Sequence, residues 1–230
     1  MDDLLKMIDC HNKLSAQSIL DALNVDGICI LKNYFHQEQI SIFEKEVDRI
    51  FIEKLDEIDI LDKEGCSKDK RIFGAQKYSN FINQNFNNNE LFKFISYSYT
   101  GRVGERKTLI NLLEHEDGKI KNSGAGWHRD NHDCQFKVIM YLTDVDTSLG
   151  NFQWITNSNK IRIGYPTPRT TSYNTRYSDE VIKALLINPH CDLVDITGPA
   201  GTIIFVDTTF IHRGKIIEQG IRKAMTQYFF

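Results

Sequence analysis

The second half of the chain is a series of short apolar segments separated by glycine, aspartate and asparagine, and this feature most constrains the fold. Segments of this length, rich in β-branched and aromatic residues and bounded by turn residues, are typical of antiparallel strands. Several of them in series predict an antiparallel barrel or jelly roll. The expected strands are residues 108–113, 136–142, 151–155, 193–196, 202–206 and 221–229.

The first part of the chain, about residues 1–105, is expected to be mainly helical. Apolar residues follow helical spacing over residues 37–55, and residues 90–99 are expected to form a second helix. A short apolar run at residues 28–31 predicts a strand. The charge-rich residues 56–72 predict a solvated connection.

Residues 157–190 contain three of the four prolines and show no clear strand. We therefore expect a long insertion here that covers the barrel as a lid. A chain of 230 residues suits a single domain, residues 1–230, that includes both the helical part and the lid.

The composition excludes several classes of protein. Lys and Arg number 28 against 31 Asp and Glu, a formal net charge of -3, so we expect no basic surface for nucleic acid or for a membrane. No apolar run is long enough to span a bilayer, and the chain starts with acidic residues, so we expect neither a membrane helix nor a signal peptide. Cysteines without a C-x-x-C pair indicate free thiols, so we expect a cytoplasmic protein. The cysteines are Cys10, Cys29, Cys66, Cys134 and Cys191.

His128 and Asp130 form the sharpest local motif, H-x-D. On an extended segment, residues i and i+2 point to the same side, so both can face one cavity. His212, which precedes the last expected strand, supplies a second imidazole. Two histidines and one carboxylate on one side of an ion leave its other side open, which is the facial triad of Fe(II) oxygenases. These three residues are the predicted catalytic metal ligands.

Other interpretations of these residues stay open. H-x-D also occurs by chance in a surface turn, where Asp130 would accept from nearby backbone N–H groups. The sequence H-R-D also resembles a kinase catalytic loop, but neither G-x-G-x-x-G nor D-F-G accompanies it. No partner for a nucleophilic Cys134 is identifiable, and the possible zinc ligands lack spaced doublets. Those possible ligands are His115, His132, Cys134, His190 and Cys191.

Arg222 lies ten residues after His212, across a turn expected at residues 218–220. A hairpin there returns Arg222 to the side of the metal-binding strand. A guanidinium binds a carboxylate through two parallel hydrogen bonds, which suits a dicarboxylate co-substrate such as 2-oxoglutarate. The alternative is a surface arginine on an edge strand.

Four segments, WHRD, KVIMYLTDVD, GNFQWITNSNK and GPAGTIIFVDTTFIHRG, followed by Arg222, carry a family resemblance. With them, about residues 20–230 resemble the phytanoyl-CoA dioxygenase family. The resemblance implies a double-stranded β-helix, a cupin-like jelly roll that is mainly β with flanking helices. It also implies Fe(II), 2-oxoglutarate and O₂. By its motif, His128, Asp130 and His212 would hold the iron, and Arg222 the distal carboxylate of 2-oxoglutarate.

The resemblance places three further residues near the co-substrate. Asn111 lies on a strand that contacts 2-oxoglutarate in relatives, Lys77 lies near another co-substrate contact, and Tyr141 lies near an aromatic position after H-x-D. One step of register along a strand reverses the face, and each would then be an ordinary strand or loop residue. The family often has P-G-S-H where this chain has T-N-S-N at residues 156–159, so a histidine is absent from that turn.

The resemblance implies an enzyme that hydroxylates a small molecule. Halogenating relatives lack the carboxylate of the triad, so the presence of Asp130 favours hydroxylation or desaturation. Arginines and tyrosines of the expected lid can bind an anionic substrate, or they belong to a solvated loop. A non-catalytic ligand-binding module on the same fold is the other function considered, because a fold does not fix a function. The lid residues are Arg162, Arg169, Arg176, Tyr165, Tyr173 and Tyr177.

Overall fold

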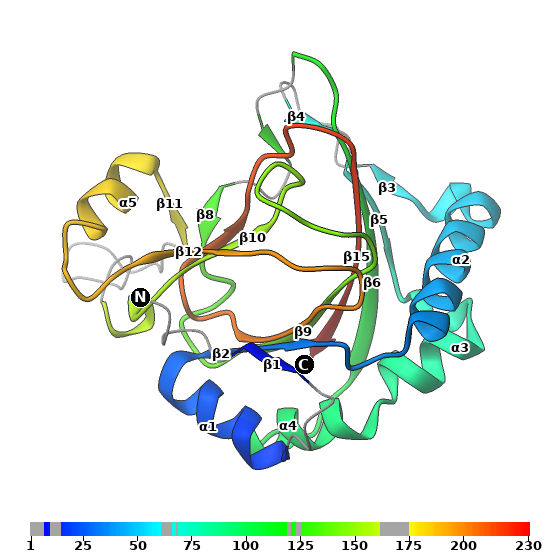
Figure 1. Cartoon of the computed structure of the whole chain (residues 1–230), viewed down its shortest axis with the longest axis horizontal. Helices are drawn as coiled ribbons and strands as arrows, with labels where there is room; N and C mark the ends of the chain where they lie inside the picture. The colour runs from blue at the N-terminus through cyan, green and yellow to red at the C-terminus, as the bar shows by residue number, and fades with distance from the viewer. Residues whose placement is uncertain are drawn as a thin grey trace.

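Two antiparallel β-sheets pack against each other in the computed structural model, and helices cover the outside of the larger sheet (Figure 1). The structure describes residues 7–9, 15–60, 66–67, 69–118, 121–122, 126–161 and 175–230. The larger sheet has the order β1 (Met7–Asp9), β2 (Ile28–Lys32), β13 (Ile203–Asp207), β9 (Phe136–Tyr141), β15 (Ile221–Phe229), β6 (Arg106–Glu114), β5 (Asp69–Phe73) and β3 (Asp59–Ile60). The smaller sheet has the order β11 (Arg176–Tyr177), β8 (Trp127–His128), β14 (His212–Gly214), β10 (Phe152–Ile155) and β12 (Leu193–Ile196).

Every neighbouring pair in the two sheets is antiparallel except β1 with β2. A separate short pair, β4 (Cys66–Ser67) with β7 (Lys121–Asn122), is parallel. Two facing, mainly antiparallel sheets with helices outside them form a jelly roll. This confirms the predicted fold class.

Strand β13 shows why both faces of the larger sheet are apolar. Alternate side chains of a strand point to opposite faces. Ile203 and Phe205 pack in the cluster under the helices, whereas Ile204 and Val206 pack between the two sheets. An unbroken apolar run is therefore required here, because both faces of the strand are buried.

Four helices cover the outer face of the larger sheet, along its lower and right-hand sides in Figure 1. Helix α1 ends at Gly27, whose φ of 75° favours glycine; a Cβ at this position would lie 2.2 Å from the ring of Phe210. Phe210 lies two residues before His212, so this close approach also fixes the chain at the predicted metal site. The helices are α1 (Ala16–Asp26), α2 (Gln37–Glu53), α3 (Asn80–Ile82) and α4 (Glu90–Thr100), with short 3-10 helices at Leu55–Glu57 and Ala75–Lys77 and a π-helix at Asn83–Asn87.

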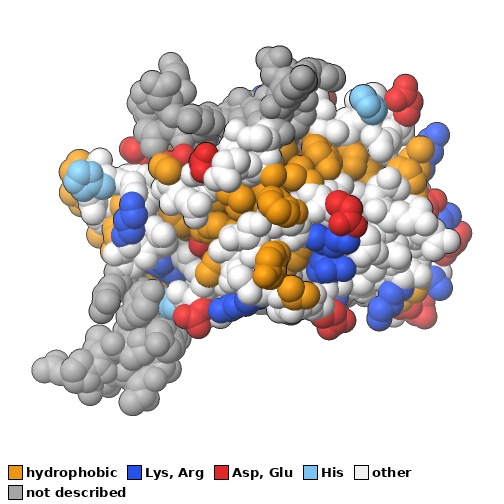
Figure 2. All heavy atoms as spheres, turned by 90° about the horizontal axis from the view of Figure 1, so that it is seen from below, with side chains coloured by type: hydrophobic (Ala, Val, Ile, Leu, Met, Phe, Trp, Pro, Cys, Tyr) orange, Lys and Arg blue, Asp and Glu red, His pale blue; other side chains and the backbone are white. Residues whose placement is uncertain are grey.

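The face seen from below in Figure 2 carries a band of apolar side chains between charged ones. Large apolar residues of α4 and of the segments near it are among the exposed ones. No helix in the described part of the chain is long and apolar enough to cross a membrane. The exposed apolar residues near α4 are Phe94, Tyr97, Val103 and Phe230.

Two segments differ from the sequence-based expectation. Residues 56–72 include β3 and most of β5, and β5 pairs with β6 as part of the larger sheet rather than forming a solvated connection. Residues 157–190, expected to show no strand, contain β11 and helix α5 (Asp179–Leu185), with a short turn at Ser158–Lys160. The lid prediction for residues 162–174 falls outside the described residues.

Candidate metal centre

The two predicted histidines lie on neighbouring strands of the smaller sheet. His128 ends β8 and His212 begins β14, and the two residues are direct partners in the antiparallel register. Their ring centroids are 4.4 Å apart. Asp130 follows two residues after His128, so its side chain turns to the same side. The sheet pairing therefore brings together residues that are 84 positions apart in the chain.

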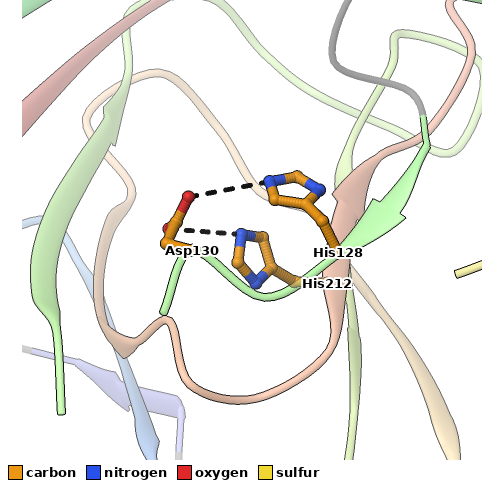
Figure 3. Close-up of side chains that lie close together, drawn as sticks. All are labelled: His128, Asp130 and His212. Carbon is orange, nitrogen blue, oxygen red and sulfur yellow. Dashed lines mark ion pairs between the residues drawn. The ribbon is translucent and has the colours of Figure 1, made fainter. Parts of the chain in front are cut away.

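The three side chains point toward one another (Figure 3). The Asp130 carboxylate lies 3.8 Å from Nε2 of His128 and 3.6 Å from Nε2 of His212. Two ligand atoms at about 2.1 Å from one ion lie about 3 to 4 Å apart, depending on the angle between them. The observed distances fall in this range. In the part of the chain that the structure describes, this is the one group of three His, Cys, Asp or Glu side chains close enough to share an ion.

Backbone carbonyls fix the tautomer of both imidazoles. Nδ1 of His128 lies 2.8 Å from the carbonyl oxygen of Gly126, and Nδ1 of His212 lies 2.8 Å from that of Phe210. A carbonyl only accepts, so each Nδ1 carries a proton and donates it. Each Nε2 therefore presents a lone pair toward Asp130. This arrangement is typical of metal-binding histidines, whose other ring nitrogen is held by a neighbouring group.

Burial and charge give the three groups the protonation states that a metal requires. Burial lowers the pKa of His212 to about 3 and also lowers the pKa of His128, so both imidazoles are neutral at pH 7. Burial alone would raise the pKa of Asp130, but attraction to His212 in its protonated form and to Lys137 outweighs burial, and the pKa is lowered. With neutral imidazoles, the Lys137 ammonium is the cation that keeps this carboxylate ionised. Neutral imidazole and carboxylate are the ligand forms that bind metal.

A cavity of about 360 Å³ lies beside these three residues. The larger sheet provides its floor, because alternate residues of four strands point into it: Asp69 and Arg71 of β5; Leu109, Asn111 and Leu113 of β6; Lys137, Ile139 and Tyr141 of β9; Arg222, Ala224, Thr226 and Tyr228 of β15.

Arg222 lies in this cavity, on β15. The expected hairpin is not what brings it there, because β14 and β15 belong to different sheets and β15 pairs with β6 and β9. Its guanidinium donates to the backbone carbonyl of Gly150 and, at 3.1 Å, to the amide oxygen of Asn111. Its Nε–H is buried and has no hydrogen-bond partner among the described residues. A buried donor without a partner is unfavourable, and a ligand oxygen in the cavity would satisfy it.

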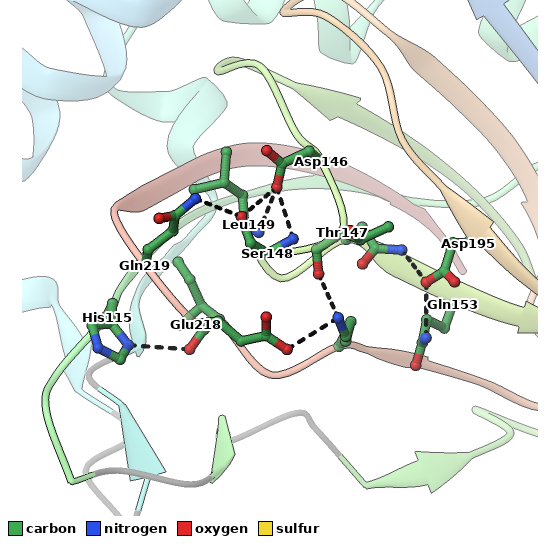
Figure 4. Close-up of polar contacts among 12 residues, drawn as sticks. His115, Asp146, Thr147, Ser148, Leu149, Gln153, Asp195, Glu218 and Gln219 are labelled. Carbon is green, nitrogen blue, oxygen red and sulfur yellow. Dashed lines mark hydrogen bonds and ion pairs between the residues drawn. The ribbon is translucent and has the colours of Figure 1, made fainter.

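The barrel rim at the Arg222 end is held by hydrogen bonds between the β9–β10 and β14–β15 loops (Figure 4). Asp146 accepts from the backbone N–H of Ser148 at 2.7 Å, and Gln219 donates to the Ser148 hydroxyl at 2.8 Å. This network fixes the loop that ends at Gly150. The carbonyl that orients Arg222 is therefore itself held in place.

The three other predicted co-substrate contacts have different positions. Asn111 lines the cavity, but its amide links Asp69 to Arg222. Tyr141 also lines the cavity, while its hydroxyl donates to the carbonyl of Ile196 and accepts from a backbone N–H, both at 2.9 Å. Burial raises the pKa of Tyr141 to about 12. Lys77 is exposed and does not line the cavity, so the structure gives no basis for its predicted contact.

Two residues that the sequence reasoning did not assign are central to this site. Lys137 is buried, lines the cavity and donates to Asp130 at 2.6 Å. Arg129, the middle residue of H-x-D, is 1% exposed and donates to the carbonyls of Ser158, Ile161 and Thr209. For Lys137, the sequence does contain one indication of a role at the site: it is a lysine in the otherwise apolar strand β9.

The lid residues are described only in part. Arg176 lines the cavity from β11, and the Tyr177 hydroxyl accepts from Arg129 at 3.0 Å. The other four, Arg162, Tyr165, Arg169 and Tyr173, lie outside the described residues.

The cysteines and the remaining histidines form no second metal centre within the described ranges. Cys29, Cys134 and Cys191 are free thiols, while the side chains of Cys10 and Cys66 lie outside the described residues. Burial raises the pKa of Cys134 to about 12, which makes it a poor nucleophile. Cys134 lines a second, larger cavity of about 550 Å³, which holds none of the predicted site residues.

Comparison with known proteins gives structural neighbours only. No protein-family model matches the chain, and no curated protein matches it. A crystal structure of the epimerase SnoN in complex with Fe3+, alpha ketoglutarate and nogalamycin RO has a TM-score of 0.73 at 11% identity, over 94% of this chain and 83% of that one. EctD from S. alaskensis, with 2-oxoglutarate and 5-hydroxyectoine, has a TM-score of 0.67 at 19% identity, over 95% and 77%.

HygX from Streptomyces hygroscopicus, with nickel, 2-oxoglutarate and hygromycin B bound, has a TM-score of 0.60 at 16% identity, over 94% of this chain and 87% of that one. These likenesses show a shared fold. The neighbours include an epimerase as well as proteins crystallised with 5-hydroxyectoine or hygromycin B. The fold they share with this chain is the jelly roll described above.

Proposed function

We propose that the chain is an Fe(II)- and 2-oxoglutarate-dependent oxygenase of the phytanoyl-CoA dioxygenase type that hydroxylates a small molecule. The main support for this function is that His128, Asp130 and His212 lie together beside a cavity that also contains Arg222. Three protein ligands on one side of an ion leave room for other ligands on the cavity side. The structural neighbours crystallised with iron and alpha ketoglutarate, or with 2-oxoglutarate, support the same function.

The residues present fit both groups. Neutral imidazoles are ligands of intermediate hardness and a carboxylate is a hard ligand, and this combination suits Fe(II). The partnerless Nε–H of Arg222 suits a carboxylate oxygen, and a guanidinium binds carboxylates with defined geometry. We assign the iron to His128, Asp130 and His212, and the distal carboxylate of 2-oxoglutarate to Arg222. Asn111 is then a positioning residue for Arg222, not a ligand of the co-substrate.

Bound iron and 2-oxoglutarate would supply the oxidising chemistry with O₂, releasing succinate and CO₂ while a C–H bond of the substrate is hydroxylated. The protein's own residues prepare the site for it. The carbonyls of Gly126 and Phe210 hold the imidazoles with Nε2 toward the metal position. Lys137 holds one oxygen of Asp130, which favours binding of the metal through the other.

The test is Fe(II)-dependent release of succinate from 2-oxoglutarate by protein purified without oxygen, together with binding of 2-oxoglutarate to the Co(II)-loaded protein by calorimetry. Arg222→Gln is expected to weaken 2-oxoglutarate binding at least tenfold without loss of metal. The exposed Arg102 provides a matched control, since Arg102→Gln removes the same group far from the cavity lining. Binding of 2-oxoglutarate without succinate release, with every candidate substrate, would instead favour a non-catalytic binding module.

A further inference from the structure

Lys137 is an unusual residue for the inner face of a jelly roll. It lies on β9 between apolar neighbours, is 7% exposed, and points into the cavity with Ile139 and Tyr141. Its Nζ lies 2.6 Å from Asp130 and 4.3 Å from the ring centroid of Tyr228. A lysine ammonium is strongly hydrated in water, so its burial is unfavourable unless its N–H groups find partners.

The protein provides interaction partners for only some of the N–H groups of the Lys137 ammonium. Of its three N–H donors, one is directed to Asp130 and another faces the Tyr228 ring. Among the described residues no further acceptor contacts it. Thr226 and Tyr228, on the adjacent strand, also line the cavity, and their hydroxyls have no hydrogen-bond partner in the described part of the chain. Together these groups form a polar subsite with unused donors.

This subsite is at the opposite end of the cavity floor from Arg222. Tyr228 is the register partner of Lys137, and it lies six positions after Arg222 on β15. At about 3.3 Å per residue, the backbones of these two positions are about 20 Å apart. A five-carbon diacid is much shorter than this, so a co-substrate anchored by Arg222 leaves the Tyr228 end of the floor free. The Lys137 ammonium lies between that end and Asp130.

The charge of the cavity lining favours an anion at the remaining subsite. The described lining contains four basic side chains, Arg71, Lys137, Arg176 and Arg222, against the two carboxylates Asp69 and Asp130. A divalent metal and a dianionic co-substrate add opposite and equal charges, so the cavity keeps its excess of two positive charges after both have bound. A positive excess in a partly buried cavity attracts anions.

We propose that the organic substrate carries an oxyanion, a carboxylate or a phosphate, and that Lys137 binds it with help from the Thr226 and Tyr228 hydroxyls. This inference rests on the proposed function, because it assigns the substrate side of the same cavity. It gives Lys137 two roles: one N–H holds Asp130 and another selects an acidic substrate. Neutral molecules of the same shape would leave an N–H of Lys137 without a partner.

Ligand-observed NMR on the Mn(II)-loaded protein with saturating 2-oxoglutarate tests this, because the paramagnetic ion broadens the signals of any small molecule held near it. The probes are propionate, inorganic phosphate and, as the neutral match, propionamide. We expect an oxyanion probe to be broadened and propionamide not to be. Lys137→Met is expected to weaken oxyanion binding at least tenfold, Lys137→Arg to retain it, and Lys70→Met to leave it unchanged. Lys70 lies on β5 but is absent from the cavity lining.

Affinity for 2-oxoglutarate, measured on the same variants, separates this inference from its alternatives. Retention of 2-oxoglutarate affinity in Lys137→Met, with loss of the oxyanion probe, supports it. Equal broadening of propionate and propionamide would overturn it while leaving the proposed function intact. A tenfold loss of 2-oxoglutarate affinity in Lys137→Met would assign Lys137 to the co-substrate and also overturn it. Failure of the wild-type protein to bind Mn(II) and 2-oxoglutarate would remove the proposed function and this inference together.

Discussion

Replacement of Asp130 by alanine in the metal-free protein isolates the energetic role of its ion pair with Lys137. The two charged groups are 2.6 Å apart, and their side chains are 20% and 9% exposed. Removal of one partner from a buried pair leaves an uncompensated charge and costs roughly 3–5 kcal/mol. We expect about 3 kcal/mol for Asp130→Ala, the lower end of this range, because the cavity admits some water. In a chain of this size that loss lowers Tm by about 6–12 °C.

The assay is urea unfolding followed by circular dichroism, with a chelator present. The Lys137→Met and double variants complete a mutant cycle. The double variant is expected to recover most of the lost stability, because removing both charges leaves neither of them buried alone. Asp117 provides the matched control, since its side chain is fully exposed and Asp117→Ala is expected to change stability by less than about 0.5 kcal/mol.

Metal titration of the same four proteins separates stability from function. Both variants without Asp130 are expected to lose metal affinity, including the double variant that regains stability. If Asp130→Ala were as stable as the wild type, or if the two single effects simply added in the double variant, the ion pair would have no energetic role and the reasoning would be refuted.

Three further outcomes follow from buried groups at the site. Arg129→Met is expected to lower the unfolding free energy by about 3 kcal/mol or more, measured by urea unfolding, because three carbonyls and a hydroxyl lose their donor. Because burial lowers the pKa of His212 to about 3, whereas an unfolded histidine titrates near 6.5, the unfolded metal-free chain binds more protons between these values. Its stability is therefore expected to fall as the pH drops below about 6.5, by up to about 1.4 kcal/mol per pH unit, and His212→Asn is expected to flatten this slope. Burial raises the pKa of Cys134 to about 12, so mass spectrometry is expected to show much slower alkylation by iodoacetamide at pH 8 than for free glutathione.

The strands of the sheets were predictable where burial dominates the local composition. The apolar runs at β9 and β13 identify strands without any knowledge of their partners, because both of their faces are covered. Strand β5 was misjudged as a solvated connection, since it begins Asp-Lys-Arg. Its strand conformation depends on pairing with β6, and the burial of Asp69 depends on Arg71 and Asn111. Neither can be read from local composition.

In the candidate site, too, some positions follow from the local sequence and others depend on long-range pairing. The convergence of His128 and Asp130 follows from their spacing of two, and that of His212 from the order of the strands. The position of Lys77 had to be inferred across a loop, and the structure places it on the surface, outside the described lining of the cavity. The role of Lys137 could not be predicted for another reason. Its separation from H-x-D along the sequence does not show whether its side chain faces the cavity, and only the register of β9 does. Where the position of a side chain depends on long-range strand register, spacing along the sequence does not predict it.

The H-x-D motif is rigid because its middle residue is as constrained as its outer two. Where His128 and Asp130 face the cavity, the alternation of an extended chain turns Arg129 to the opposite side. There its guanidinium donates to Ser158, Ile161 and Thr209 carbonyls and to the Tyr177 hydroxyl, so one side chain joins three separate segments. A metal site needs its ligands held before the ion arrives. Arg129 holds the backbone between two of those ligands, so its loss is expected to reduce metal affinity even though it never contacts the ion.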